Sequence, residues 1–262
     1  MTTKYRITPE ILGEGQYGKV HTAYHKRKKI VAKVSKPKKG KKYEQEYKLL
    51  KSLKHGNIVN VIGYEKIGPT SYIYFDYYPL TLKDFLKKYG KVYQKRNYFK
   101  EDTSLDIMKQ LVDALVYLHS KHIVHLDVKL TNIMMDKYFN VKLADFGFSR
   151  VQPRGSELVG VIAGSSHYIT PEMYKAFKVR TKTYCGYKSD TWAAGVCLFF
   201  LLTGTYPFLK GDEGLEHNTI HKKFVIPQKF KISPQTKSLL QKIFVKNYKN
   251  RIDIFDVQDI IS

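Results

Sequence analysis

The chain has 262 residues, 43% hydrophobic and 14% aromatic, which is typical of a folded chain with a core. It carries 46 Lys and Arg against 23 Asp and Glu, a formal net charge of +23. The longest apolar run, 192–202, is too short to cross a bilayer, and there are two cysteines, Cys185 and Cys197. This excludes a transmembrane or disulfide-stapled protein. It also predicts an intracellular, reducing location, the cytoplasm or the nucleus.

The basic excess is almost entirely lysine, with 39 lysines and 7 arginines. Such a field attracts phosphate, nucleic acid or an anionic membrane. Base reading and bidentate recognition favour arginine, however. A basic nucleic-acid-associated protein is therefore kept as an alternative, as is a weak electrostatic association with nucleic acid.

The first part of the chain is rich in β-type sequence. Stretches of Val, Ile and Tyr predict five strands, at 7–12, 19–24, 30–34, 59–64 and 72–77. One helix is expected at about 42–53, where Tyr47, Leu50 and Leu53 recur at helical spacing.

After Pro79 the pattern becomes helical. Apolar residues at helical spacing predict helices starting near 82 and covering about 105–118, 192–202, 239–244 and 257–261. The sequence thus predicts a small β-rich part followed by a larger α-rich part.

A glycine motif, Gly-Glu-Gly-Gln-Tyr-Gly-Lys-Val at 13–20, lies between the first two predicted strands. Glycines let backbone amides approach phosphates closely. The motif opens a strand rather than a helix, so a dinucleotide-binding interpretation is poor. Lys33, on the third strand, could reach phosphates held under this loop. Glu46 could pair with Lys33 and fix its position, with Glu44 as a competitor.

A second motif, His-Leu-Asp-Val-Lys-Leu-Thr-Asn at 125–132, is followed by Asp-Phe-Gly at 145–147. Phosphoryl transfer needs one carboxylate beside the acceptor hydroxyl, a carboxylate and an amide that hold Mg²⁺, and a cation on the departing charge. Asp127, Asp145, Asn132 and Lys129 supply that set at close spacing. Each residue alone would more often cap a turn.

With these motifs in this order, the chain resembles the eukaryotic-type protein kinase family. The segment Gly-Ser-Ser-His-Tyr-Ile-Thr-Pro-Glu at 164–172 resembles the end of an activation segment. Ser-Asp-Thr-Trp at 189–192 resembles the start of the buried helix that anchors the catalytic loop, and Arg251 matches the late arginine that pairs with Glu172. Lys129 and Ser165 follow the Ser/Thr-type pattern.

The resemblance implies an α+β, bilobal protein kinase fold, with a small β-rich N-terminal lobe and a larger α-helical C-terminal lobe. Residues 1–262 would form a single kinase domain, with lobes at about 5–78 and 79–262. The implied reaction transfers the γ-phosphoryl group of Mg-ATP to a Ser or Thr hydroxyl of a protein substrate. No membrane span and no obligate regulatory subunit are expected. An inactive kinase-like scaffold and a small-molecule kinase remain alternatives.

The resemblance also assigns roles to individual residues. Asp127 would orient the acceptor hydroxyl and accept its proton, and Lys129 would stabilise the γ-phosphoryl group. Lys33 would contact the α- and β-phosphates, and Asn132 and Asp145 would ligate Mg²⁺. The residues placed around ATP are Leu12, Gly13, Gly15, Gly18, Val20, Val31, Lys33, Glu46, Phe75, Asp76, Tyr78, Met134 and Asp145. Among them Phe75 aligns as the gatekeeper, residues 76–78 as the hinge, and Val31 and Met134 as the apolar residues above and below adenine.

Leu126 departs from the family pattern, because it replaces the arginine that normally receives an activation-loop phosphate. We therefore expect activity that does not depend on phosphorylation of this loop, although Ser149 and Ser156 are available in it for phosphorylation. Two opposing hypotheses concern the substrate. The acidic residues Asp212, Glu213 and Glu216 could read a basic residue of the substrate, or the basic field could attract acidic substrates.

Overall fold

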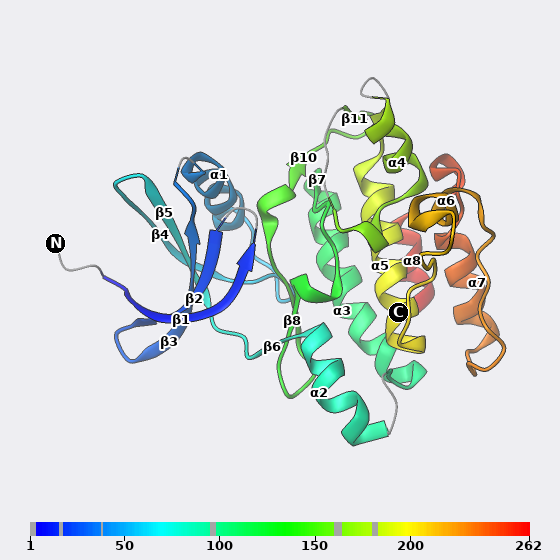
Figure 1. Ribbon diagram of the computed structural model, residues 1–262, viewed down its shortest axis with the longest axis horizontal. Helices are drawn as coiled ribbons and strands as arrows, with labels where there is room; N and C mark the ends of the chain where they lie inside the picture. Colours follow the sequence, from blue (N-terminus) through cyan, green and yellow to red (C-terminus); the bar gives the residue numbers. More distant parts are fainter. Residues whose placement is uncertain (1–3, 16–17, 38, 95–97, 160–163, 180–182) are drawn as a thin grey trace. The chain divides into compact units, whose positions relative to one another are not determined.

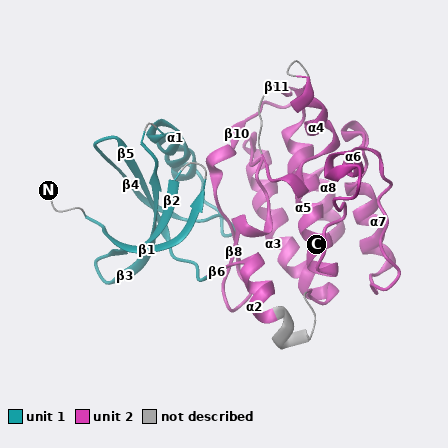
Figure 2. Ribbon diagram, in the orientation of Figure 1, with its two compact units in different colours: residues 1–79 teal, residues 80–262 magenta. Residues whose placement is uncertain are grey.

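The computed structural model describes residues 4–15, 18–37, 39–94, 98–159, 164–179 and 183–262. It divides into two compact units, Met1–Pro79 and Leu80–Ser262 (Figure 2). The first unit is a β-sheet with one helix, and the second is mostly helical (Figure 1).

The first unit is built on a five-stranded antiparallel sheet in the order β1-β2-β3-β5-β4. Its strands are β1 (Arg6–Gly15), β2 (Gly18–His25), β3 (Lys28–Ser35), β4 (Val61–Ile67) and β5 (Thr70–Asp76). Side chains alternate across β3, so Ile30 and Ala32 are buried on one face. They pack with Ala23 and Tyr74, and the Tyr5 ring stacks on Tyr74 at 3.8 Å. All five predicted strands are present.

Helix α1 (Gly40–Lys51) packs against β4 and β5. Tyr43, Glu46 and Leu50 are its buried residues, and their spacing places them on one helical face. The expected range of 42–53 was wrong at both ends. The helix begins at Gly40, which packs closely on Ser71, because an added Cβ would lie 2.6 Å from Ser71 Oγ. It ends before Ser52, whose N–H and hydroxyl both bond to Leu49 O.

The second unit contains most of the helices. They are α2 (Leu82–Gln94), α3 (Glu101–Ser120), α4 (Pro171–Lys178), α5 (Gly186–Thr203), α6 (Gly214–His221), α7 (Pro234–Ile243) and α8 (Ile254–Ile261). Three short strands form one sheet in the order β6 (Leu80–Thr81), β8 (Ile133–Met135), β9 (Val141–Leu143). The second unit also contains two separate strand pairs, β7 (Ile123–Val124) with β10 (Arg150–Val151), and β11 (Leu158–Val159) with β12 (Thr183–Tyr184).

Helix α5 is the centre of the second unit and contacts α3, α7 and α8 (Figure 1). It is buried on nearly all sides, as its continuous apolar sequence predicted. A Cβ at Gly195 would lie 2.3 Å from Ile243 Cγ2, so the glycine allows α7 to pack closely. The helix ends at Gly204, which adopts a left-handed conformation with φ of 71°. Cys197 is buried in α5, and Cys185 just before it is also a free thiol.

Within the described ranges, none of the helices combines the length and the hydropathy that a membrane span needs.

Candidate active site

The loop after β7 is held by hydrogen bonds to Asp190, near the start of α5. Asp190 Oδ2 accepts the His125 N–H at 2.7 Å, and Oδ1 accepts the Leu126 N–H at 2.8 Å. His119 Nε2 lies 3.0 Å from Oδ2, the same oxygen that accepts the His125 N–H. Asp190 is almost fully buried, so these bonds replace the water that its charge would otherwise bind. The buried helix therefore fixes the backbone of the loop that carries Asp127.

His125 is a structural residue of this loop. The Asp127 N–H points at His125 Nδ1 at 3.3 Å, so Nδ1 is the acceptor. Nε2 must then carry the proton and donate to Ala144 O at 3.1 Å. Burial lowers the pKa of His125 below its ordinary value of 6.5, and nearby carboxylates oppose this shift without reversing it. The ring, which also meets Phe146 edge-on at 4.9 Å, is therefore neutral and tied to two segments of the site.

This neutral histidine predicts a loss of stability in acid. The folded state disfavours the proton that the unfolded chain takes up below about pH 6.5, so the free energy of unfolding falls as the pH drops. One such group adds a slope of up to about 1.4 kcal/mol per pH unit. The opposing carboxylates are those of Asp190, Asp127 and Asp145. In urea titrations of the ligand-free protein, we expect a steeper decline from pH 7 to pH 5.5 in the wild type than in His125→Phe. Equal slopes in both proteins would contradict this.

Asp127 is the centre of a hydrogen-bonded cluster. Its Oδ2 accepts from Lys129 Nζ at 2.7 Å and from Asn132 Nδ2 at 2.9 Å. Its Oδ1 accepts a hydrogen bond from the Ser165 hydroxyl at 3.3 Å, and Lys129 Nζ donates a hydrogen bond to the oxygen of that hydroxyl at 3.0 Å. Asp127 as a whole residue is 4% exposed, so its carboxylate is buried. The cluster thus holds a carboxylate, a cation and a hydroxyl within bonding distance, which suits proton acceptance from an alcohol.

Asn132 and Asp145 come from the two ends of the β8–β9 hairpin. Asn132 precedes β8, and the Ala144 N–H, just after β9, donates to Asn132 O at 2.8 Å. Asn132 Nδ2 donates to both Asp127 O and Asp127 Oδ2, which leaves its amide oxygen as the atom able to face a cation. Asp145 has a left-handed backbone with φ of 61°, a conformation that asparagine and aspartate tolerate better than most residues.

The donor set fits a hard cation. One carboxylate and one amide oxygen are typical protein ligands for Mg²⁺, which keeps water and phosphate oxygens as its other ligands. The described part of the chain contains no cluster of three or more His, Cys, Asp or Glu side chains that could hold a metal alone. Water or the oxygens of a bound ligand would complete the coordination of a metal held here.

In the first unit, the predicted pairing of Lys33 with Glu46 is present. Lys33 Nζ, on β3, lies 2.7 and 2.8 Å from the two carboxylate oxygens of Glu46 on α1. The Glu46 side chain is 2% exposed and that of Lys33 is 16% exposed. The competitor, Glu44, instead pairs with Lys48 at the surface. Strand and helix thus hold one ammonium in a fixed position.

The three glycines of the loop differ in their surroundings. At Gly13 and Gly15, an added Cβ would have no described atom within 4 Å, so the backbone there has room for a ligand. At Gly18 the same atom would lie 2.0 Å from Val34 O, and the residue is therefore required by packing. Gly15 pairs with Gly18 across β1 and β2, and residues 16–17 lie outside the described residues.

The residues predicted around the adenine ring are distributed over both units. In the first unit, Leu12 lies on β1, and Val20 pairs with Gly13. Val31 pairs with Phe75 between β3 and β5. Met134, in the second unit, pairs with Thr81 and Lys142.

At the end of β5, Asp76 accepts from Lys28 Nζ at 2.6 Å and from Asn60 Nδ2 at 2.9 Å. The Asp76 side chain therefore fixes the end of β5, and Tyr78 follows two residues later. The contacts of Asp76 with Lys28 and Asn60 thus position the backbone that leads to Tyr78.

Leu126 lies in an apolar cluster rather than at the surface. It is 4% exposed, has a left-handed φ of 65°, and packs with Val124, Met173 and Tyr184. Phe148, Leu158 and Ile169, from the segment after Asp-Phe-Gly, are partly buried against the same cluster.

Ser149 is less accessible than expected. It is 7% exposed, and its hydroxyl donates to His125 O at 3.4 Å. It was wrong to treat it as available for phosphorylation in the folded protein. Ser156 is exposed.

The predicted contact between Glu172 and Arg251 is a bidentate ion pair, with distances of 2.7 and 3.0 Å. Arg251 also donates to Val245 O and Lys188 O, and its guanidinium lies 4.7 Å from the centre of the Trp192 ring. The pair is buried, and it joins the start of α4 to the segment before α8.

Tyr168 and His119 were not predicted. The Tyr168 hydroxyl accepts the Leu130 N–H at 3.3 Å and so supports the loop that carries Asp127. His119 belongs to an apolar helix pattern and has no distinguishing motif. Both contacts span long sequence separations that periodicity does not reveal.

The acidic residues near α6 are largely paired. Glu216 lies 2.7 Å from Lys178 Nζ, and Glu213 lies 3.1 Å from His217 Nδ1. Of these three acidic residues, only Asp212 has neither a lysine nor a histidine contact of this kind among the described residues. This lowers the charge available to read a basic substrate residue.

A sheet with a fixed lysine–glutamate pair, and a helical unit with an anchored Asp-Lys-Asn loop and Asp-Phe-Gly, together define a protein kinase catalytic domain. A family model described as "protein kinase domain" matches residues 7–260. This chain belongs to the protein kinase family, and the predicted family and fold are confirmed.

Two curated relatives are similar over nearly the whole chain. The carbon catabolite-derepressing protein kinase of Candida glabrata is 30% identical over 267 residues, covering 97% of this chain and 40% of that protein. The serine/threonine-protein kinase KIN4 of Saccharomyces cerevisiae is 30% identical over 267 residues, covering 95% of this chain and 32% of that protein. The chain thus spans less than half the length of these relatives.

Proposed function

We propose that the chain is a Ser/Thr protein kinase, which transfers the γ-phosphoryl group of ATP to a protein hydroxyl. The observation that carries this proposal is the cluster of Asp127, Lys129, Asn132 and Ser165, in which the Asp127 carboxylate already accepts a hydrogen bond from a hydroxyl group. The names of the relatives, both protein kinases and one of them serine/threonine-specific, support the class of reaction.

In the proposed reaction, Asp127 orients the acceptor hydroxyl and takes its proton as the oxygen bonds to the γ-phosphorus. The bond from that phosphorus to the β–γ bridging oxygen breaks, and ADP leaves. Lys129 stabilises negative charge on the transferred group, since its Nζ lies beside both Asp127 and the hydroxyl that marks the acceptor position. Lys33, held by Glu46, contacts the α- and β-phosphates.

We propose Mg²⁺ as the metal, held by Asp145 and the amide oxygen of Asn132. When bound, it neutralises charge on the phosphate oxygens. The remaining residues placed around ATP act in binding, with Gly13 and Gly15 giving the phosphates close access to the backbone.

The test is transfer of labelled γ-phosphate from Mg-ATP to a generic protein, followed by phosphoamino-acid analysis. The purified chain is used without added proteins, so the same assay tests the proposal that no obligate regulatory subunit is needed. We expect label on Ser and Thr, and loss of transfer in Lys33→Met. ATP binding without any transfer would instead favour an inactive scaffold, and transfer only to a small molecule would favour a small-molecule kinase.

We further propose that activity does not depend on phosphorylation of the activation segment. The apolar cluster around Leu126 supports this, because Phe148, Leu158 and Ile169 pack against it where the family usually has an arginine for a phosphate. Burial of apolar side chains can order the segment without a charge-assisted contact.

Phosphatase treatment of the purified protein is therefore expected to leave the transfer rate within about twofold. Leu126→Ala, in contrast, opens a cavity that costs about 2–5 kcal/mol and loosens the segment, so the rate should fall. The rate is measured before and after treatment, with mass spectrometry to confirm dephosphorylation. Abolition of activity by phosphatase would refute the proposal.

We propose an intracellular, reducing location, supported by the two free cysteines. A weak electrostatic association with nucleic acid is a subsidiary proposal, supported by the charge of +23. It would appear as binding that needs no ATP and falls steeply with salt.

A further inference from the structure

One stretch of the second unit carries positive charge without any acidic residue. Residues 217–252 contain eight lysines and one arginine, and none of the 23 acidic residues of the chain. Arg251 is buried and paired with Glu172. Seven of the lysines are exposed: Lys222, Lys223, Lys229, Lys231, Lys237, Lys242 and Lys249. None of these seven has an ion pair in the described part of the chain.

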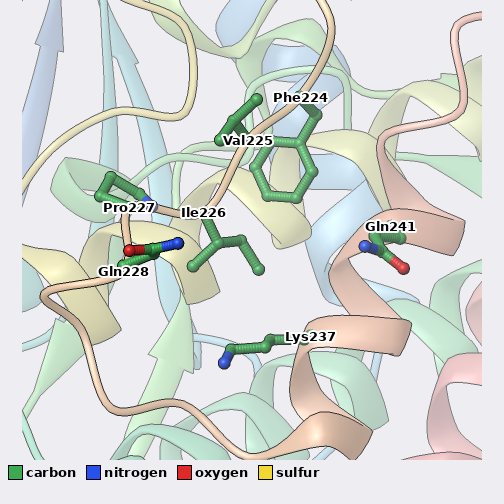
Figure 3. Close-up of a pocket in the computed structure, with 7 residues that line it drawn as sticks. All are labelled: Phe224, Val225, Ile226, Pro227, Gln228, Lys237 and Gln241. Carbon is green, nitrogen blue, oxygen red and sulfur yellow. The ribbon is translucent and has the colours of Figure 1, made fainter.

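An apolar groove lies within this basic stretch. Its cavity has a volume of about 290 Å³ and is bordered by the segment between α6 and α7 and by α7 itself. Figure 3 shows Phe224, Ile226 and Pro227 on one side, with Lys237 and Gln241 of α7 facing them. This volume accommodates one or two large apolar side chains.

The apolar wall of the groove is anchored from inside. The Phe224 ring packs 4.5 Å from Phe244 and 5.6 Å from Phe199, measured between ring centres. The next residue, Val225, is 65% exposed, although a valine gains about 1.5–3 kcal/mol from full burial. The Phe230 N–H donates to Pro227 O at 3.1 Å and closes a turn at the end of this wall. The wall is therefore preformed, and it presents an unburied valine.

One acidic group that acts on this surface is Glu101, at the start of α3. Its carboxylate accepts the N–H and the hydroxyl of Ser233, at 2.9 and 2.6 Å. It is therefore engaged in holding the start of α7, and Lys237 is near enough to act on it electrostatically. Most of the lysine charge around the groove is left for a partner.

We propose that this groove docks an acidic protein segment with a large apolar side chain, which would insert beside Val225 while flanking carboxylates meet the lysines. A second copy of this chain is a poorer occupant, because each copy carries a net charge of +23 and the two would repel each other. Nucleic acid fits less well, since it offers no aliphatic side chain for Ile226 and Val225. The only arginine of the stretch is also committed to Glu172.

The docking surface goes beyond the proposed phosphotransfer, because it needs neither ATP nor the residues of the Asp127 cluster. A segment held there would raise the local concentration of a substrate that carries it. An acidic segment docked there would also offset part of the positive charge of this surface.

Binding is measured by fluorescence anisotropy without ATP, so that the result does not depend on kinase activity. The probe is a labelled peptide of 12 residues, with Ile-Phe at its centre and Asp and Glu elsewhere. A second peptide has Ser-Ser in place of Ile-Phe, and a third probe is a labelled dT12 oligonucleotide. The variants are Val225→Asp and Lys237→Glu. Their matched controls are Ile67→Asp, an exposed apolar residue of the first unit, and Lys137→Glu, an exposed lysine outside the stretch.

We expect the Ile-Phe peptide to bind, and both groove variants to weaken it about tenfold, which is about 1.4 kcal/mol. The controls should change it less than twofold, and the Ser-Ser peptide should bind about tenfold more weakly. Unchanged thermal unfolding establishes that the variants are folded. No binding, equal binding of the two peptides, or equal binding by Val225→Asp would overturn the proposal. Tighter, Val225-dependent binding of dT12 would overturn it in favour of a nucleic-acid site.

Discussion

Asp127→Asn is expected to lower kcat for phosphoryl transfer by about 10²–10⁴-fold, the range associated with loss of a positioned general base. The substituted side chain keeps the shape of the original. Its oxygen can still accept from Lys129 and Asn132, and its NH₂ group can donate to the Ser165 hydroxyl. What it loses is the negative charge and the ability to take a proton from the acceptor.

The structure therefore predicts a specific pattern for this variant. The midpoint of urea unfolding and the affinity for ATP should change little, because the local hydrogen bonds are retained and Asp127 is proposed to act on the acceptor. Initial rates at saturating Mg-ATP measure kcat, and nucleotide titration measures affinity. Asp259→Asn, at an exposed aspartate of α8, is the control and should stay within about twofold. An Asp127→Asn protein with more than a fifth of wild-type kcat would contradict the assigned role.

The parts of the site that sequence could predict are those fixed by short spacing or by a recognisable motif. Asp127, Lys129 and Asn132 lie within six residues of one another, so their hydrogen bonds follow from one loop. Lys33 meets Glu46 across a larger separation, and its position on a strand just before the helix of Glu46 made that pairing predictable, with Glu44 left as a competitor. The pairing of Glu172 with Arg251 was predictable only from the family resemblance.

Contacts without a motif could not be predicted. Tyr168 reaches Leu130 and His119 reaches Asp190 because separate segments pack together, which depends on tertiary structure rather than local sequence. The roles of Val31, Phe75 and Met134 around adenine still rest on the resemblance alone.

The helices show the same division. The long apolar patterns of α3 and α5 identified them, whereas α4 and α6, with eight residues each, were not predicted. Short helices gain little from intrinsic propensity and depend on packing and capping. The signal for α4 was Thr170 before Pro171, since the Thr170 hydroxyl accepts the Met173 N–H as an N-cap. For α6 no side-chain cap is present, and its sequence contains Asn218 and Thr219, which favour helices weakly.

The second large effect is expected from Arg251→Met, which leaves Glu172 buried without its partner. Removing one member of a buried ion pair typically costs about 3–5 kcal/mol. Here Val245 O and Lys188 O also lose a donor, so the value should lie at the upper end of that range. Because whole domains are stable by only about 5–15 kcal/mol, the variant should lose a large part of its stability.

Equilibrium unfolding in urea tests this, with Lys48→Met as the matched control, because Lys48 and Glu44 form an exposed pair with side chains 71% and 43% accessible. Exposed pairs contribute about 0–1 kcal/mol, so the control should change the free energy of unfolding by no more than that. The double variant Glu172→Met with Arg251→Met removes both charges at once. It should be less destabilised than the sum of the two single variants, because the main cost is an unpaired buried charge. A loss below 1 kcal/mol in Arg251→Met would show that water or another group replaces the guanidinium, and the pair would then not be the structural link that its burial indicates.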